Sequence, residues 1–377
     1  MLDLDFTDEQ EMLREMVRGV CEQHCSVEVV RANEDDPIGV ASELWAQLAE
    51  LGLLGLMLPE EHGGAGSTLL DGVILYEELG RALAPVPHLE SCVLAAGALL
   101  YAGSDEQIAA WLPGISAGSS VVVPAWLEPG NGYTPRGVQL TARSDGDGFV
   151  LDGAKAHVRF AAAADQLVVL ARTGELPGDI DLFLVDPKAS GVTMEQQMTV
   201  GSDTQYRVEF SGVQVAASAR IGDPGSGWVT WSKAMEPAMV LLAAQANGGA
   251  EHALEITNQY AKDREQFDKP LGAFQAISHY LADAKTNVDG SKLLTYEAAW
   301  AESTGRPLRR LAPMSKLFAC NTFRDTTAMA QQVFGGVGFT LEYEIQLYFR
   351  RAKQLQLSFN DTRRCEELVA DAVLETA

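Results

Sequence analysis

The sequence predicts an α+β chain with a helical N-terminal domain, a middle antiparallel β domain and a C-terminal four-helix bundle, at residues 1–119, 120–224 and 225–377. Three observations predict this order. Up to about residue 117, apolar residues recur every three or four positions, as in helices. Between Val121 and Gly222 they fall in short runs rich in Val, Phe and Leu, separated by Gly, Asp and Pro, as in strands. After Gly227 the helical spacing returns.

The N-terminal helices have recognisable start and stop signals. Thr7, with Glu9 and Gln10 behind it, predicts the start of the first helix. A second helix near residues 43–51 ends at Gly52, and a loop rich in Gly and Pro over residues 59–66 precedes a third. The apolar side of the first helix comprises Met12, Met16, Val17 and Val20, and the third carries Val73, Tyr76, Glu77 and Leu79.

Residues 114–118 fit the GxSxG pattern of serine hydrolases. A nucleophile elbow needs a strand before the Ser and a helix after it. Here a helical segment approaches Ser116 and a strand follows, so we assign no serine nucleophile.

The β domain should contain seven strands in a small barrel or sandwich. The runs lie at residues 121–125, 138–143, 149–155, 166–172, 181–186, 192–198 and 206–215.

Three long helices and the C-terminal segment predict the bundle. The first covers residues 228–261, with Pro237 at a kink or in a late first turn, and the third covers residues 308–332. Between them, a stripe after Pro270 predicts a core-facing helix, and it comprises Phe274, Ile277, Leu281, Ala284 and Val288.

Length and composition indicate an enzyme-sized chain. Its 377 residues, 47% of them apolar, can form two or three cores. The net charge of −24 opposes nonspecific binding to nucleic acid or anionic membranes. With no run of 18 apolar residues and an acidic N-terminus, we expect a cytoplasmic protein without membrane insertion.

The five cysteines predict neither disulfides nor a metal site, because their number is odd and no CxxC pair occurs. Cys21, His24 and Cys25 fall on one helical stretch but lack further metal ligands. We expect reduced thiols on helix faces.

Two segments of the C-terminal domain carry residue types that suit a pyrophosphate-linked aromatic cofactor. Arg264, Phe267 and Gln275 offer a guanidinium fork, a flat ring and an amide. Residues 332–340 contain paired glycines, which let the backbone approach a phosphate or a ring closely. Taken alone, each segment also suits an ordinary interhelix turn.

In wording and order, these segments resemble the RxQFGxPLGxFQAIxHxLADM and QxxGGxGFT signatures of the acyl-CoA dehydrogenase family, with Asp268 where Gly is usual. The resemblance covers essentially the whole chain and implies an FAD cofactor. In the family, a neighbouring subunit supplies such residues to the adenine and pyrophosphate of FAD. That assignment carries onto Arg264, Phe267, Gln275, Gln332, Gly335 and Gly336.

The resemblance implies α,β-dehydrogenation of an acyl-CoA thioester, with a Glu as base and an electron-transferring flavoprotein as acceptor. One family position for the Glu falls on Phe359 and the other on Ala238, so both are empty. Glu236 and Asp361 each lie two residues away and are weak candidates. Their simpler roles are a carboxylate beside Pro237 and an N-cap for the last helix.

The flavin-ring side of the family pattern is also altered. The usual TEPxxGSD loop keeps only Glu128 and Pro129, and Arg159 stands where the family places a hydroxyl facing the ring. Residues for a neighbour's FAD are thus retained while those for the chain's own flavin and substrate are lost.

Three hypotheses follow. The first is a base-lacking partner subunit of an α2β2 heterotetramer, the second a self-sufficient homotetramer with a displaced base at Glu236 or Asp361. The third is a structural or regulatory relative that binds neither FAD nor CoA. Straight-chain, branched and sterol-derived acyl groups all remain open.

Overall fold

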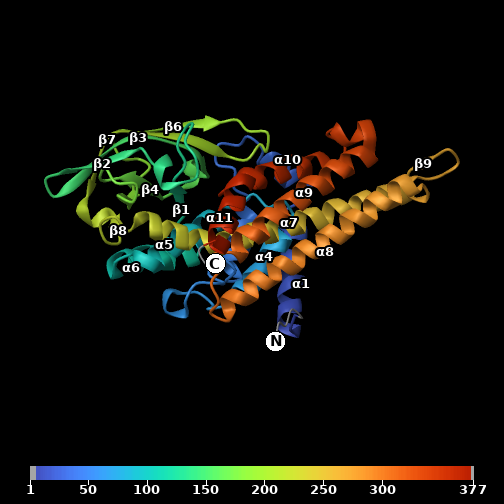
Figure 1. The fold of residues 1–377 in the computed structure, drawn as a ribbon, viewed down its shortest axis with the longest axis horizontal. Coiled ribbons are helices and arrows are strands. Elements are labelled where there is room, and N and C mark those ends of the chain that lie inside the picture. The colour runs from blue at the N-terminus through green and yellow to red at the C-terminus, as the bar shows by residue number, and fades with distance from the viewer. Residues whose placement is uncertain (1–5, 375–377) are drawn as a thin grey trace. The chain divides into compact units, whose positions relative to one another are not determined.

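The computed structural model describes residues 6–374 and divides into two compact units (Figure 1). The bundle unit comprises the chain up to Glu28, Thr68–Ala84 and the chain from Met239 on. The sheet unit comprises Val29–Ser67 and Pro85–Ala238. The succession of helical, β-rich and helical parts predicted from the sequence is confirmed.

The bundle unit is all helical apart from one small hairpin. Its central helix is α9 (Leu311–Phe334), which packs against α8, α10 and α11 and is buried along most of its length. The other helices are α1 (Asp8–His24), α4 (Leu69–Arg81), the later part of α7 (Gly227–Asp263), η6 (Leu271–Ala273), α8 (Gln275–Ser303), η7 (Gly335–Phe339), α10 (Ile345–Leu357) and α11 (Thr362–Leu374).

The start of α1 is as predicted, but its predicted apolar side is buried only in part. Thr7 and Gln10 form a reciprocal capping box. The predicted inner residue Met12 is 68% exposed and Met16 is exposed as well, whereas Val17 and Cys21 are buried. Apolar residues lie on more than one side of this helix, so spacing alone could not select the side that packs on α4.

Two expectations for the long helices also need correction. Pro237 lies well inside α7 rather than in its first turn, and the helix continues past it to Asp263. The apolar stripe of α8 is buried only at Ala284 and Val288. Phe274 and Leu281, nearer the start of the stripe, are half-buried in this chain.

The sheet unit contains one eight-stranded sheet, and all seven predicted runs form strands in it. The order is β6-β7-β3-β2-β4-β5-β8, with β1 beside β4. The β1–β4 and β2–β4 pairings are parallel, so the sheet is mixed and not wholly antiparallel as predicted. The strands are β1 (Val122–Ala125), β2 (Thr141–Asp145), β3 (Gly148–Arg159), β4 (Gln166–Arg172), β5 (Ile180–Val185), β6 (Val192–Gln197), β7 (Gln205–Ala216) and β8 (Arg220–Ile221).

Helices of the sheet unit include a short π-helix, η2 (Leu89–Ala95), that leads into α5 (Ala96–Ala102). Ser116 of the GxSxG pattern ends α6 (Asp105–Ser116), and its buried hydroxyl donates to the carbonyl of Gly63 at 2.6 Å. It is therefore a structural turn residue. The remaining helices are α2 (Val27–Ala32), which crosses the unit boundary, α3 (Ser42–Glu50), η1 (Glu60–His62), η3 (Pro135–Gly137), η4 (Ala161–Ala163) and η5 (Ala217–Ala219).

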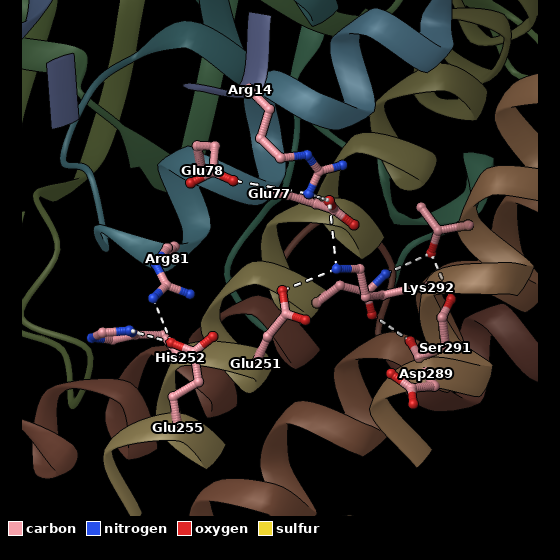
Figure 2. A network of polar contacts seen from close by, with 12 residues as sticks. Arg14, Glu77, Glu78, Arg81, Glu251, His252, Glu255, Asp289, Ser291 and Lys292 are labelled. Carbon is pink, nitrogen blue, oxygen red and sulfur yellow. Dashed lines mark hydrogen bonds and ion pairs between the residues drawn. The ribbon is translucent and has the colours of Figure 1, made fainter. Parts of the chain in front are cut away.

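A buried network of charges ties together helices of the bundle unit (Figure 2). Glu77 and Glu78 are adjacent on α4 and both are buried. Arg14 of α1 donates to Glu77 at 2.9 Å, the Tyr296 hydroxyl of α8 donates to it at 2.8 Å, and Lys292 lies 3.9 Å away. Burial raises the pKa of Glu77, and Lys292 and Arg14 oppose that rise. The carboxylates thus link α1, α4 and α8.

His88 of the sheet unit should lower the free energy of unfolding as the pH falls. Its ring is fully buried, Nε2 lies 3.1 Å from the Leu53 carbonyl, and burial lowers its pKa to about 4. In the unfolded chain the ring gains its proton near pH 6.5, so the unfolded state binds more protons between pH 6.5 and 4. The free energy of unfolding should therefore decrease as the pH is lowered from 6.5 to 4, by roughly 3 kcal/mol from this group.

Urea unfolding at several pH values measures the effect. The midpoint of the wild type should fall more steeply from pH 6.5 to 4 than that of His88→Gln, which keeps a neutral donor for Leu53. His279→Gln, at an exposed histidine of α8, should follow the wild type. Parallel curves for the wild type and His88→Gln would contradict the prediction.

Candidate functional site

The first of the two cofactor-like segments forms a projecting tip between α7 and α8. Strands β9 (Glu265–Gln266) and β10 (Lys269–Pro270) pair as a hairpin. Its two turn residues, Phe267 and Asp268, have φ values of 53° and 61°, as in a type I′ turn. Asp tolerates this left-handed conformation better than most residues, which explains how it stands where the family usually has Gly.

Side chains on this tip are exposed. Phe267 is 86% exposed, and Gln275, the first residue of α8, is exposed as well. Among residues 6–374, nothing forms a hydrogen bond or ion pair with the guanidinium of Arg264. A guanidinium, a ring and an amide are therefore all available to another molecule.

The second segment lies where α9 ends. Gly335 has φ 66° and ψ −143°, a backbone conformation open essentially to glycine alone. A Cβ at Gly335 or Gly336 would meet no atom within 4 Å, and Gln332 is exposed. The backbone at this turn is thus open to a ligand.

Aromatic stacking brings the two segments to the same end of the bundle unit. The rings of Tyr260, near the end of α7, and Phe334, at the end of α9, stack with centroids 4.2 Å apart. Tyr343 packs edge-on against both. Arg264 follows Tyr260 by one helical turn, and Gly335 follows Phe334 directly, so both predicted segments are anchored on this cluster. Figure 1 shows the hairpin at the end of α7 and α8.

These residues fit the nucleotide end of FAD. The guanidinium suits pyrophosphate oxygens, the exposed ring suits adenine, and the glycine turn allows close approach of backbone amides. Because these residues are exposed in this chain, they suit a ligand shared with another molecule.

No carboxylate stands at either position where the resemblance places a base. Ala238 is fully buried in α7, and Phe359 is 6% exposed. Oδ1 of Asp361 accepts from the backbone N–H of Arg364 at 2.8 Å, so this residue caps α11. Glu236 is half-buried on α7 and points about 200° from Ala238 around the helix.

A buried lysine, not foreseen from the sequence, fixes the segment next to Phe359. Lys316 of α9 is 1% exposed, and its ammonium donates to the carbonyls of Asn360 at 2.7 Å and Leu355 at 3.4 Å. The cation also complements the C-terminal end of α10. It thereby holds the connection between α10 and α11.

The loop that keeps the family Glu-Pro is held by a second buried lysine. Glu128 accepts from the Lys155 ammonium at 2.8 Å and from the backbone N–H groups of Gln139 and Leu140, both at 2.8 Å. Burial lowers the pKa of Lys155 to about 8, and Glu128 opposes that change. Glu128 is therefore fully occupied in holding its own loop.

Arg159 also points inward. Its Nη1 lies 2.8 Å from Oε1 of Glu90, and its Nε lies 3.4 Å from Oδ2 of Asp203. Glu128 and Arg159, which the sequence associates with the flavin ring, are thus each paired with an opposite charge of their own chain.

Within residues 6–374, no helix is both long and apolar enough to cross a bilayer.

Comparisons with known proteins agree with this architecture. Family models for the N-terminal, middle and C-terminal domains of acyl-CoA dehydrogenases match residues 7–119, 125–213 and 225–358. The caffeyl-CoA reductase–Etf complex subunit CarC of Acetobacterium woodii is 30% identical over 98% of this chain and 99% of its own length.

Two solved structures are similar over nearly the whole chain. One is the ChsE4–ChsE5 complex from Mycobacterium tuberculosis, with 29% identity, a TM-score of 0.90 and coverage of 100% of both chains. The other is a variant of the steroid acyl-CoA dehydrogenase Tcur3481–Tcur3483, with 32% identity, a TM-score of 0.87 and coverage of 98% of both chains. The chain therefore belongs to the acyl-CoA dehydrogenase family.

Proposed function

We propose that this chain is the base-lacking subunit of a heteromeric, FAD-dependent acyl-CoA dehydrogenase of the cytoplasm. The observation that carries the proposal is a contrast. The nucleotide-end residues are exposed and unoccupied by their own chain, whereas Ala238 and Phe359 stand where a base is expected. The residues offered to the FAD of a second subunit are Arg264, Phe267, Gln275, Gln332, Gly335 and Gly336.

Each of these residues has a distinct task. Arg264 grips pyrophosphate oxygens with its fork, and Phe267 stacks on the adenine. The amides of Gln275 and Gln332 pair with donors and acceptors of the nucleotide, and Gly335 and Gly336 bring backbone amides close to it. FAD, when bound, supplies the hydride acceptor for dehydrogenation of an acyl-CoA thioester.

Similar proteins support this assembly and its partners. Two of the solved structures are named for pairs of proteins, ChsE4 with ChsE5 and Tcur3481 with Tcur3483. The latter is described as a steroid enzyme, which favours a sterol-derived acyl group as the first substrate class to test. CarC is named as part of a complex with Etf, which supports an electron-transferring flavoprotein as redox partner.

Copurification and flavin content test the proposal. The tagged chain, expressed in its own host, should bring down a second acyl-CoA dehydrogenase chain that has an intact Glu. Arg264→Ala in this chain should lower the FAD affinity of the complex by about tenfold or more, because a bidentate phosphate contact is lost. Arg143→Ala, at an exposed arginine of β2, is the matched control.

The isolated chain separates the alternatives. We expect it to retain little FAD and to leave acyl-CoA unoxidised. If it holds FAD and is bleached by acyl-CoA, and Glu236→Gln or Asp361→Asn abolishes that bleaching, the self-sufficient homotetramer is correct. If neither FAD nor a coexpressed relative shifts its thermal midpoint, the structural relative is correct.

A further inference from the structure

Three charged side chains of the sheet unit form a buried cluster that a sequence motif alone does not explain. Arg159 ends β3, Glu90 lies in the π-helix η2, and Asp203 lies two residues before β7. Their side chains are 10%, 2% and 5% exposed. Burying a charge is costly unless it is paired, so the arginine and the carboxylates that face it depend on each other.

Distances show how the cluster is organised. Asp203 accepts from Thr199 at 2.9 Å and from the Gln205 amide at 2.6 Å, so it is satisfied apart from Arg159. Glu90 makes its ion pair at 2.8 Å with Arg159 alone, among the residues described here. Burial raises the pKa of Glu90, while Arg159 opposes the rise. Moving Arg159 away would leave Glu90 buried without a counter-charge.

The backbone around Arg159 is shaped to direct it inward. The pairing of β3 with β7 shifts register between Lys155 and Val158, as at a β-bulge. His157 and Phe160 both have a φ of 55°, which is uncommon for side chains of this size. The His157 N–H donates to the Gln197 side chain at 2.8 Å and pins the bulge. Such strain persists only where the surroundings hold it in place.

We propose that Glu90, Arg159 and Asp203 close this chain's own flavin-ring face, so that the chain serves only the flavin of its partner. The inference rests on the proposed function for the identity of the cofactor. The family resemblance places small residues and hydroxyl donors beside the isoalloxazine edge at this strand. Here the strand ends on Arg159, a long side chain that is 10% exposed and whose guanidinium is paired with two buried carboxylates.

Riboflavin tests the ring face separately from the nucleotide end, because it has the ring but neither pyrophosphate nor adenine. We expect the wild-type chain to bind riboflavin only weakly, with a Kd at the upper limit of the titration. Glu90→Gln combined with Arg159→Thr removes both charges and the arginine stem, and should tighten riboflavin binding by about tenfold or more in fluorescence titration. Glu90→Gln combined with Arg159→Met removes the charges but keeps the stem, and should bind less than the Thr variant.

Matched variants and stoichiometry decide the outcome. Arg143→Ser with Asp152→Asn removes an exposed Arg–Asp pair of the same sheet and should leave riboflavin binding unchanged. If Glu90→Gln with Arg159→Thr keeps the wild-type thermal midpoint but binds riboflavin no more tightly than the wild type, the inference is overturned. If that variant does not fold, the flavin content of the wild-type complex decides. One FAD for every chain of the complex would overturn the inference, and one FAD for every two chains supports it. An unchanged FAD affinity of the complex in Arg264→Ala would instead count against the proposed function.

Discussion

Glu128→Ala should destabilise the sheet unit by about 3–5 kcal/mol. The variant leaves the ammonium of Lys155, which is 0% exposed, without its counter-charge. It also leaves the N–H groups of Gln139 and Leu140 without their acceptor. The buried ammonium of Lys155 and the buried N–H of Leu140 then carry the desolvation cost of an unpaired polar group.

Urea or thermal unfolding measures this loss, with two comparisons. Glu195→Ala removes an exposed carboxylate from β6 and should change stability by less than about 0.5 kcal/mol. Glu128→Leu with Lys155→Met removes both charges and should recover part of the loss, because an uncompensated buried charge is the larger cost. Equal stability of Glu128→Ala and Glu195→Ala would show that the buried pair is dispensable.

Gly248→Ala should destabilise the bundle unit by about 3 kcal/mol or more. A Cβ at Gly248 of α7 would lie 1.8 Å from the carbonyl oxygen of Glu77 in α4. At the same crossing, a Cβ at Gly80 would lie 2.0 Å from the carbonyl oxygen of Gln245. Backbone atoms cannot rotate aside, so the two helices would have to separate.

Gly290→Ala in α8 provides the control, because a Cβ there meets nothing within 4 Å. In a helix this change should stabilise the protein by about 0.5–1 kcal/mol. A shift of the thermal midpoint in opposite directions is therefore expected for the two alanine variants. If Gly248→Ala is as stable as the wild type, the close crossing does not limit packing.

Local sequence signals predicted the elements well but not their partners. Thr7 and Gln10 predicted the helix start, where a capping box forms, and short runs rich in Val, Phe and Leu predicted seven strands that form. The parallel pairing of β1 with β4 was not foreseen, because it joins segments more than 40 residues apart and leaves no mark in either run. In α1 the buried side follows from packing on α4, which the spacing of Met12 and Met16 does not encode.

In the candidate site, too, some residues could be predicted from the sequence and others only from the fold. The motif residues around Arg264 and Gly335 could be found from the sequence, because each motif is a short contiguous segment. The contacts of Arg159 could not, because Arg159 ends a strand and Glu90 lies in a helix far away along the chain. Lys155 and Lys316 carried no signal, since a lysine is ordinarily exposed and only the fold shows that these two are buried.

The five cysteines have a practical consequence for studying assembly. All are buried as free thiols, and burial raises the pKa of Cys25 to about 12 and that of Cys365 to about 11. Reactivity toward alkylating dyes requires an accessible thiolate, so the native chain offers almost no labelling background. A single cysteine introduced at the exposed Glu265 would thus place a fluorophore on the hairpin alone, ready to report subunit encounter in real time.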